Sequence, residues 1–118
     1  LADHGATVVR VESITHLETT RIANPYGENV PGINRSGYFA THNAGKLALT
    51  INMEKPEARP VVERLIRWAD VLIESFVPGV MARWGLSYDD VRRIKPEIIM
   101  AMHGNHCAIS DLFLYRPD

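Results

Sequence analysis

The sequence predicts an α/β domain built on an open, mostly parallel β-sheet with flanking helices. Four short apolar runs stand out along the chain, and helical patterns separate the later ones. Each run is rich in Val, Ile, Leu or Met, as strands buried in parallel sheets are. The order strand, helix, strand, helix, strand favours parallel pairing, because each helix returns the chain to the edge where the next strand begins.

The expected strands coincide with these apolar runs. We place them at residues 7–12, 47–52, 71–75 and 98–102. Residues 1–4 are typical of the last turn of a helix, with Gly5 as its C-terminal cap. We therefore expect the chain to begin inside an element. On this interpretation residues 1–118 are a fragment of one domain that lacks its first strand.

Two helices are expected between the later strands, at residues 57–69 and 88–95. The first carries apolar residues at the i, i+3, i+4 and i+7 spacing of one helical face. These residues are Val62, Leu65, Ile66 and Ala69. The second helix is marked by Ser87 and Asp90, which have the spacing of a capping box, and by Pro96 after its end.

The segment between the first two strands, residues 13–46, is long and rich in Gly, Pro and Asn. Long loops are uncommon inside compact domains unless they are functional or pack against a partner. We therefore expect this loop to take part in binding or assembly.

Composition limits the classes of function. The chain has 118 residues, with 13 basic and 14 acidic side chains, so its net charge is −1. This balance argues against a protein that binds nucleic acid through phosphate contacts. No apolar run approaches the roughly 20 residues that span a bilayer, so we expect no membrane segment. The single cysteine, Cys107, excludes an internal disulfide and suits a reducing cytoplasm.

The pair Gly45-Lys46 lies directly before the second expected strand. It does not fit a Walker loop, because Leu47 follows the lysine, a single glycine precedes it, and a strand comes next. A glycine-rich dinucleotide fingerprint is also absent after the first strand, in VRVESITHLETTR. From the residues alone, an ordinary turn and a different kind of phosphate site both remain open.

Four stretches occur in order with natural spacing: LADHGATVVRVE, SGYFATHNAGKLALTINM, ADVLIESFVPGVMARWGLSYDDV and KPEIIMA. Together they resemble the family III CoA-transferases, a group that includes formyl-CoA transferase, carnitine CoA-transferase and the α-methylacyl-CoA racemases. The resemblance covers about residues 1–102. Its most specific block is ADVLIESFVPGVMARWGL, residues 69–86.

The resemblance implies a Rossmann-like CoA-binding domain, an interlocked homodimer, and CoA and acyl-CoA as substrates, with no tightly bound cofactor. Transfer in the family runs through an aspartate that forms an anhydride and then a CoA thioester, from which CoA passes to a carboxylic acid. That aspartate is expected beyond Asp118, so we assign no catalytic residue and expect the chain alone to be inactive. An acyl-CoA racemase and a non-catalytic CoA-binding module remain as alternatives.

The resemblance also implies CoA-contacting residues. Lys46 and Arg83 match cations that contact the nucleotide end and its phosphates, and Phe76 matches an aromatic residue at the end of its strand. Ser13 stands where some members carry an arginine, and Ser75 stands where asparagine is common. Both serines can still form hydrogen bonds with the ligand.

Topology gives a separate test of these residues. Ligands of open α/β sheets sit beyond the carboxyl ends of the strands. Ser13, Phe76 and His103 all follow such ends, whereas Lys46 precedes its strand and falls at the opposite edge. Trp84 fits two roles, a wall for the adenine or core packing.

Two further features have no assigned ligand. Arg21 matches an arginine that often follows the first strand of the family. The segment HGNHC, residues 103–107, together with Asp111 holds residue types that bind zinc, but two histidines three residues apart with an adjacent cysteine lack the spacing of a structural zinc site. We expect no metal, and residues 103–118, which leave the family pattern, receive no role.

Overall fold

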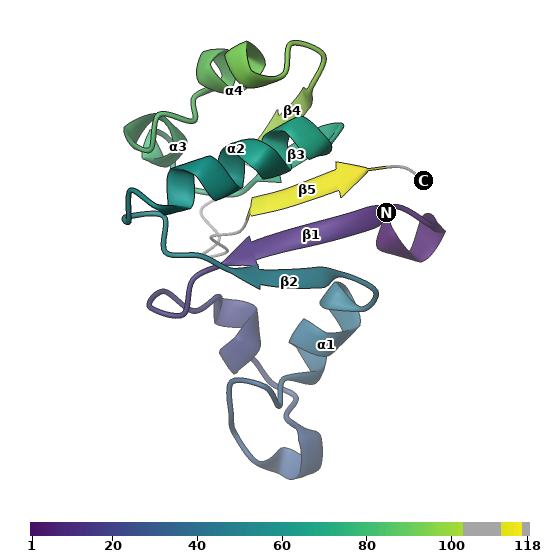
Figure 1. Cartoon of the computed structure of the whole chain (residues 1–118). Helices are drawn as coiled ribbons and strands as arrows, with labels where there is room; N and C mark the ends of the chain where they lie inside the picture. The colour runs from purple at the N-terminus through teal and green to yellow at the C-terminus, as the bar shows by residue number, and fades with distance from the viewer. Residues whose placement is uncertain (103–111, 117–118) are drawn as a thin grey trace.

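The computed structural model describes residues 1–102 and 112–116. A five-stranded sheet in the order β2-β1-β5-β3-β4 forms its centre (Figure 1). The strands are β1 (Thr7–Glu12), β2 (Leu47–Thr50), β3 (Val71–Glu74), β4 (Ile99–Met102) and β5 (Leu112–Arg116). The α/β class and the four expected strands are confirmed, with ends that differ by one or two residues from those expected.

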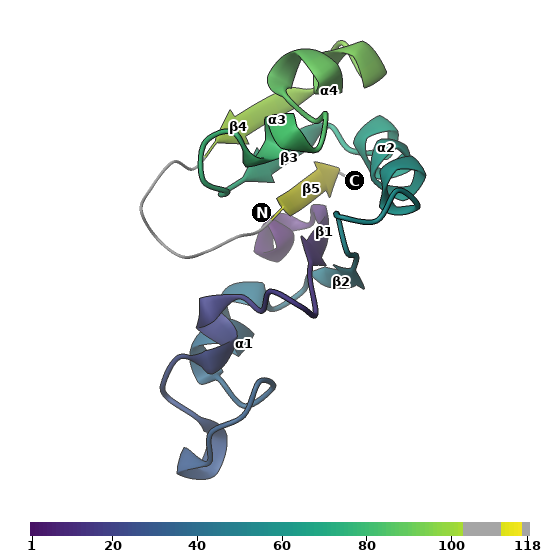
Figure 2. The same cartoon turned by 90° about the vertical axis from the view of Figure 1, so that its left-hand side faces the viewer.

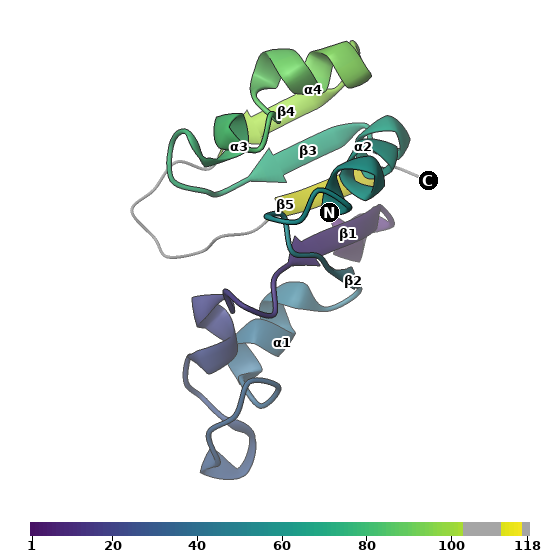
Figure 3. The ribbon, with the colours of Figure 1, turned by 60° about the vertical axis from the view of Figure 1, so that its left-hand side comes forward.

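The fifth strand, β5, makes the sheet mixed. β1 pairs in parallel with β2, and β3 pairs in parallel with β4, as expected. β5 lies between these two pairs (Figure 3) and runs antiparallel to both β1 and β3 (Figure 1). The other four strands therefore all point the same way. No expected strand covered residues 112–116, and half of the pairings rather than most of them are parallel.

The helices cover one face of this sheet. They are α2 (Ala58–Trp68), α3 (Val80–Arg83) and α4 (Tyr88–Ile94). α2 and α4 confirm the two expected helices, and α3 is an additional single turn. The capping box at α4 is present: Asp90 N donates to Ser87 Oγ at 3.3 Å, and Ser87 N donates to Asp90 Oδ2 at 3.1 Å.

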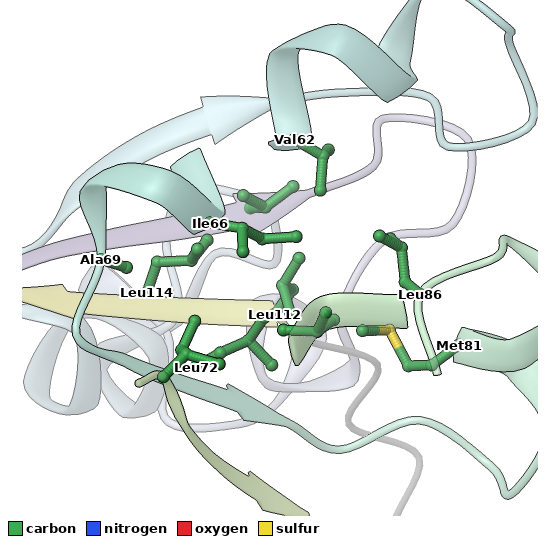
Figure 4. Close-up of a cluster of buried hydrophobic side chains, with 11 residues drawn as sticks. Val62, Ile66, Ala69, Leu72, Met81, Leu86, Leu112 and Leu114 are labelled. Atoms are coloured by element: carbon green, nitrogen blue, oxygen red, sulfur yellow. The ribbon is translucent and has the colours of Figure 1, made fainter. Parts of the chain in front are cut away.

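The main core lies between these helices and the sheet (Figure 4). α2 places Val62 and Ile66 against the sheet, where they meet the central leucines of β3 and β5. These are Leu72, Leu112 and Leu114, with exposed fractions of 0%, 1% and 0%. Both parallel pairs and β5 thus contribute to one continuous core.

The segment 13–46 extends away from the sheet beyond β2 (Figure 2). It is more regular than the loop we expected, because it contains η2 (Thr19–Ile22), η3 (Gly27–Asn29) and α1 (Gly37–Asn43). Ser36 caps α1 by accepting a hydrogen bond from Phe39 N at 3.1 Å.

The beginning of the chain agrees with its sequence. A single 3-10 turn, η1 (Ala2–His4), ends at Gly5, whose φ of 93° is the left-handed conformation of a helix C-cap. Within residues 1–102 and 112–116, no helix is both long and apolar enough to cross a bilayer.

Candidate ligand-binding site

A hollow of about 320 Å³ lies beyond the carboxyl ends of β1 and β3, and we call it the central hollow. Part of its apolar lining comes from Val11 of β1, Ile51 directly after β2 and Leu112 at the start of β5. In a doubly wound sheet, ligands bind in the crevice at this end, where the chain connections diverge to the two sides. The central hollow is therefore where the fold class predicts a ligand.

The β3 side supplies an aromatic wall. Phe76 and Trp84 meet edge to face, with ring centroids 5.1 Å apart and an interplanar angle of 86°. The buried carboxylate of Glu74 accepts a hydrogen bond from Phe76 N at 2.8 Å, which fixes the backbone where β3 ends. Trp84 lines the central hollow and also packs against the core, so core packing is confirmed, while its role as a wall for the adenine stays a prediction.

Arg83 borders the central hollow at the end of α3. Its side chain is exposed, and within the described residues it forms no ion pair. Its guanidinium is therefore available to an anionic ligand. A guanidinium presents a planar set of donors that matches phosphate oxygens.

The β1 side of the central hollow is built on Glu12. Arg21 donates to both of its carboxylate oxygens, from Nε at 2.8 Å and from Nη2 at 2.5 Å, and Arg10 Nη1 donates at 3.1 Å. These hydrogen bonds, chiefly those from Arg21, hold the pKa of Glu12 below its usual value even though partial burial acts in the opposite direction. Glu12 is thus an ionised carboxylate whose charge two arginines offset, so it does not repel an anion.

Arg21 thereby acquires a structural role. It also donates to Asn34 Oδ1 at 2.9 Å, and its guanidinium lies 3.9 Å from the centroid of the Phe39 ring. Arg21 ties β1 to three parts of the 13–46 segment. It positions the rim of the central hollow but is not among the described residues that line it.

The structure brings three of the five predicted site residues together. Ser13, Phe76 and Arg83 line the central hollow, whereas Lys46 and Ser75 do not appear among its lining residues in the described part of the chain. Lys46 lies directly before the amino end of β2, and its ammonium donates to Asn43 Oδ1 at 3.1 Å and stands 4.6 Å from the centroid of the Phe113 ring. The topological placement of Lys46 at the opposite edge is confirmed.

Some lining residues were not predicted. His16, Asn52 and Glu54 also border the central hollow. Asn52 and Glu54 follow β2, so the rule that placed ligands beyond strand ends would have found them. The predictions that concern His103, Cys107 and Asp111 lie outside the described residues.

Comparison with known proteins identifies the family. A family model described as CoA-transferase family III matches residues 1–106. The chain belongs to CoA-transferase family III. The resemblance inferred from its motifs is thereby confirmed, and strand β5 lies outside the matched residues.

Curated members of this family resemble the chain over most of its length. It is 41% identical to an acyl-CoA transferase of Fusarium pseudograminearum, over 86% of this chain and 23% of the relative. It is 38% identical to a succinate–glutarate CoA-transferase of Agrobacterium fabrum, over 84% of this chain and 25% of the relative. The chain thus spans about a quarter of the length of these relatives.

Solved structures agree with the fold. A hypothetical protein of Mycobacterium tuberculosis matches with a TM-score of 0.71 and 30% identity, over 99% of this chain and 30% of that chain. A CaiB/BaiF family protein of Brucella suis matches with a TM-score of 0.67 and 32% identity, over 80% of this chain and 25% of that chain.

Proposed function

We propose that this chain is part of a CoA-transferase that moves CoA from an acyl-CoA to a carboxylic acid, and that the central hollow binds the nucleotide end of CoA. Membership of CoA-transferase family III supports the reaction class. The observation that carries the binding site is the pairing of an aromatic wall with an available guanidinium at the carboxyl end of the sheet.

Each residue then has a chemical role. The Phe76–Trp84 wall packs against the adenine, Arg83 binds a phosphate, and Ser13 offers a hydroxyl at the β1 side. Lys46 and Ser75 keep the roles implied by family resemblance as predictions only. CoA and acyl-CoA are substrates in this proposal, and no tightly bound cofactor takes part.

Replacing Arg83 by alanine is expected to weaken CoA binding by about ten- to a hundredfold, because a charge-assisted hydrogen bond to phosphate is lost. Lys46→Ala should have a smaller effect, since a lysine is a single point charge and Lys46 is not among the described residues that line the central hollow. Isothermal calorimetry with CoA measures both. Arg64→Ala, which removes an exposed arginine of α2, is the charge-matched control. Unchanged CoA affinity in Arg83→Ala would remove Arg83 from the site.

We further propose that the catalytic aspartate lies outside these 118 residues and that transfer runs through its anhydride and thioester. The chain alone should therefore show no CoA transfer from acyl-CoA donors to carboxylic acids. Turnover above the rate in buffer would show that the nucleophile is among these residues.

The topology of the sheet supports the interpretation that the domain is incomplete. Doubly wound sheets have the order 3-2-1-4-5, with the first strand at the centre and parallel to its neighbours. Here β1 and β2 take the positions of strands 2 and 3 on one side of the centre, and β3 and β4 take those of strands 4 and 5 on the other side. The antiparallel β5 occupies the central position. We propose that β5 takes the place of a parallel first strand of the longer protein.

We also propose that the longer protein is a homodimer in a reducing cytoplasm, as its family resemblance and single cysteine imply. Large apolar side chains are exposed on several elements, including Ile14 at 76%, Val77 at 74% and Ile99 at 62%. We expect the chain to self-associate through such surfaces. Sedimentation velocity over a hundredfold range of concentration measures this, and a single monomeric species throughout would contradict it.

A further inference from the structure

The strand β4 forms one edge of the sheet, and within residues 1–102 and 112–116 no strand pairs with its outer side. Its residues, Ile99–Met102, include no charged side chain and no proline, which are two common means of protecting an edge strand. The side chains of Ile99 and Met102 are each 62% exposed. β4 is therefore an apolar edge strand, and such strands are typical sites for pairing with another strand.

The bonds between β4 and β3 show which backbone groups of β4 face outward. Ile99 N donates to Asp70 O at 3.0 Å, so the backbone groups of Ile99 point toward β3. Successive residues of a strand turn their N–H and C=O groups to alternate sides. Met100 and Met102 therefore present these groups to the outer edge, where an extended backbone is the partner that fits them.

A second copy of β4 fits this edge in antiparallel orientation. With a twofold axis perpendicular to the sheet at Ala101, Met100 of each copy lies opposite Met102 of the other, and each pair exchanges two N–H···O=C bonds. The two small Ala101 side chains then face each other. Opposite residues share a face of the sheet, so the methionine pairs extend the helix-covered face, where Met100 already packs against the core.

The charges of α4 also favour an antiparallel copy. α4 lies at the β4 end of the sheet (Figures 1 and 3), with the exposed Asp89 in its first turn and the exposed Arg92 in its last turn. A twofold axis reverses the direction of the helix, so the acidic start of each α4 lies toward the basic end of the other. A parallel copy would instead align like charges.

We propose that two copies of this chain pair through β4, antiparallel and about a twofold axis at Ala101, so that their sheets join into one. This inference rests on the self-association proposed above and gives it a specific surface, and it does not depend on CoA binding. Pairing satisfies the outward backbone groups of Met100 and Met102, and it covers part of the exposed Met102 side chain.

The first test is Ala101→Lys, compared with the parent chain by sedimentation velocity over a hundredfold range of concentration. The substitution places two like charges directly opposite each other, so the dissociation constant of the dimer should rise about tenfold. Ala101→Glu should have the same effect, and an equimolar mixture of the two variants should associate again. Ala48→Lys is the matched control, because Ala48 is exposed on the same face of the sheet at its other edge, and it should associate like the parent chain.

Cross-linking tests the register with a smaller side chain. Opposite residues at a non-hydrogen-bonded position of antiparallel strands are close enough for a disulfide. Ala101→Cys in a Cys107→Ser background should therefore form a covalent dimer under mild oxidation, and Ala48→Cys in the same background should not.

Each failure has a distinct meaning. If the parent chain associates but Ala101→Lys associates equally well, or the Lys and Glu variants do not restore association, or Ala101→Cys does not cross-link, then pairing through β4 is wrong and self-association uses another surface. If the parent chain stays monomeric at every concentration, the proposed self-association fails, and pairing through β4 fails with it.

Discussion

Arg10→Ala is expected to lower the free energy of unfolding by about 3–5 kcal/mol, because it removes one partner from a buried group of charges. Arg10 lies on β1 with an exposed fraction of 1%, and its guanidinium contacts the carboxylates of Glu12 and Glu18. Glu12 keeps Arg21 as a partner, but Glu18, itself 5% exposed, loses the guanidinium of Arg10. Urea unfolding followed by circular dichroism measures the change.

Arg67→Ala is the matched control for this prediction. It makes the same substitution in an exposed ion pair of α2, where Arg67 Nη2 lies 3.2 Å from Glu63 Oε2, and it should cost no more than about 1 kcal/mol. A double variant, Arg10→Met with Glu18→Leu, removes both buried charges and should recover much of the loss. Equal, small losses for Arg10→Ala and Arg67→Ala would show that the buried charges contribute no more than a surface pair.

The change in stability at acid pH is a second test of the charges around Arg10 and Glu12. Because the pKa of Glu12 is lowered in the folded state, its ionised form stabilises the fold above the usual carboxyl pKa. That stabilisation is lost as the pH falls through the lower, folded-state value. In Glu12→Gln the loss of stability on acidification should therefore be smaller than in the parent chain.

The parallel strands and the helices α2 and α4 could be predicted because their signals are local. The face of α2 is visible in the spacing of Val62 and Ile66, and the start of α4 in the pair Ser87 and Asp90. β5 could not be predicted in the same way. Its partners, β1 and β3, are distant in the sequence, and nothing within residues 112–116 specifies which strands it joins or in which direction.

The residues of the candidate site also divide into those with a local signal in the sequence and those whose role depends on contacts made only in the folded chain. Ser13, Phe76 and Arg83 could be placed because each lies after a strand or in a specific motif. The role of Arg21 could not, because it depends on side-chain contacts with Glu12 and Phe39 that only the folded 13–46 segment creates. The position of the turn after α3 likewise depends on its packing against α2, because Arg59 donates hydrogen bonds to the carbonyls of Trp84 and Gly85.

The central position of β5 leads to the last prediction, that Leu114→Ala lowers the free energy of unfolding by about 2–5 kcal/mol. Leu114 is fully buried, and its backbone register places it opposite Val9 on one side and Leu72 on the other. Truncation would leave a cavity where both parallel pairs meet, and the rigid neighbours can fill it only in part. Leu47→Ala makes the same change at the edge strand β2, where the side chain is 59% exposed, and should alter stability by no more than about 0.5 kcal/mol. Urea unfolding of the two variants beside the parent chain decides the matter. Similar, small losses at both positions would mean that residues 112–116 are not seated between β1 and β3, and the replacement of a parallel first strand by β5 would fall with them.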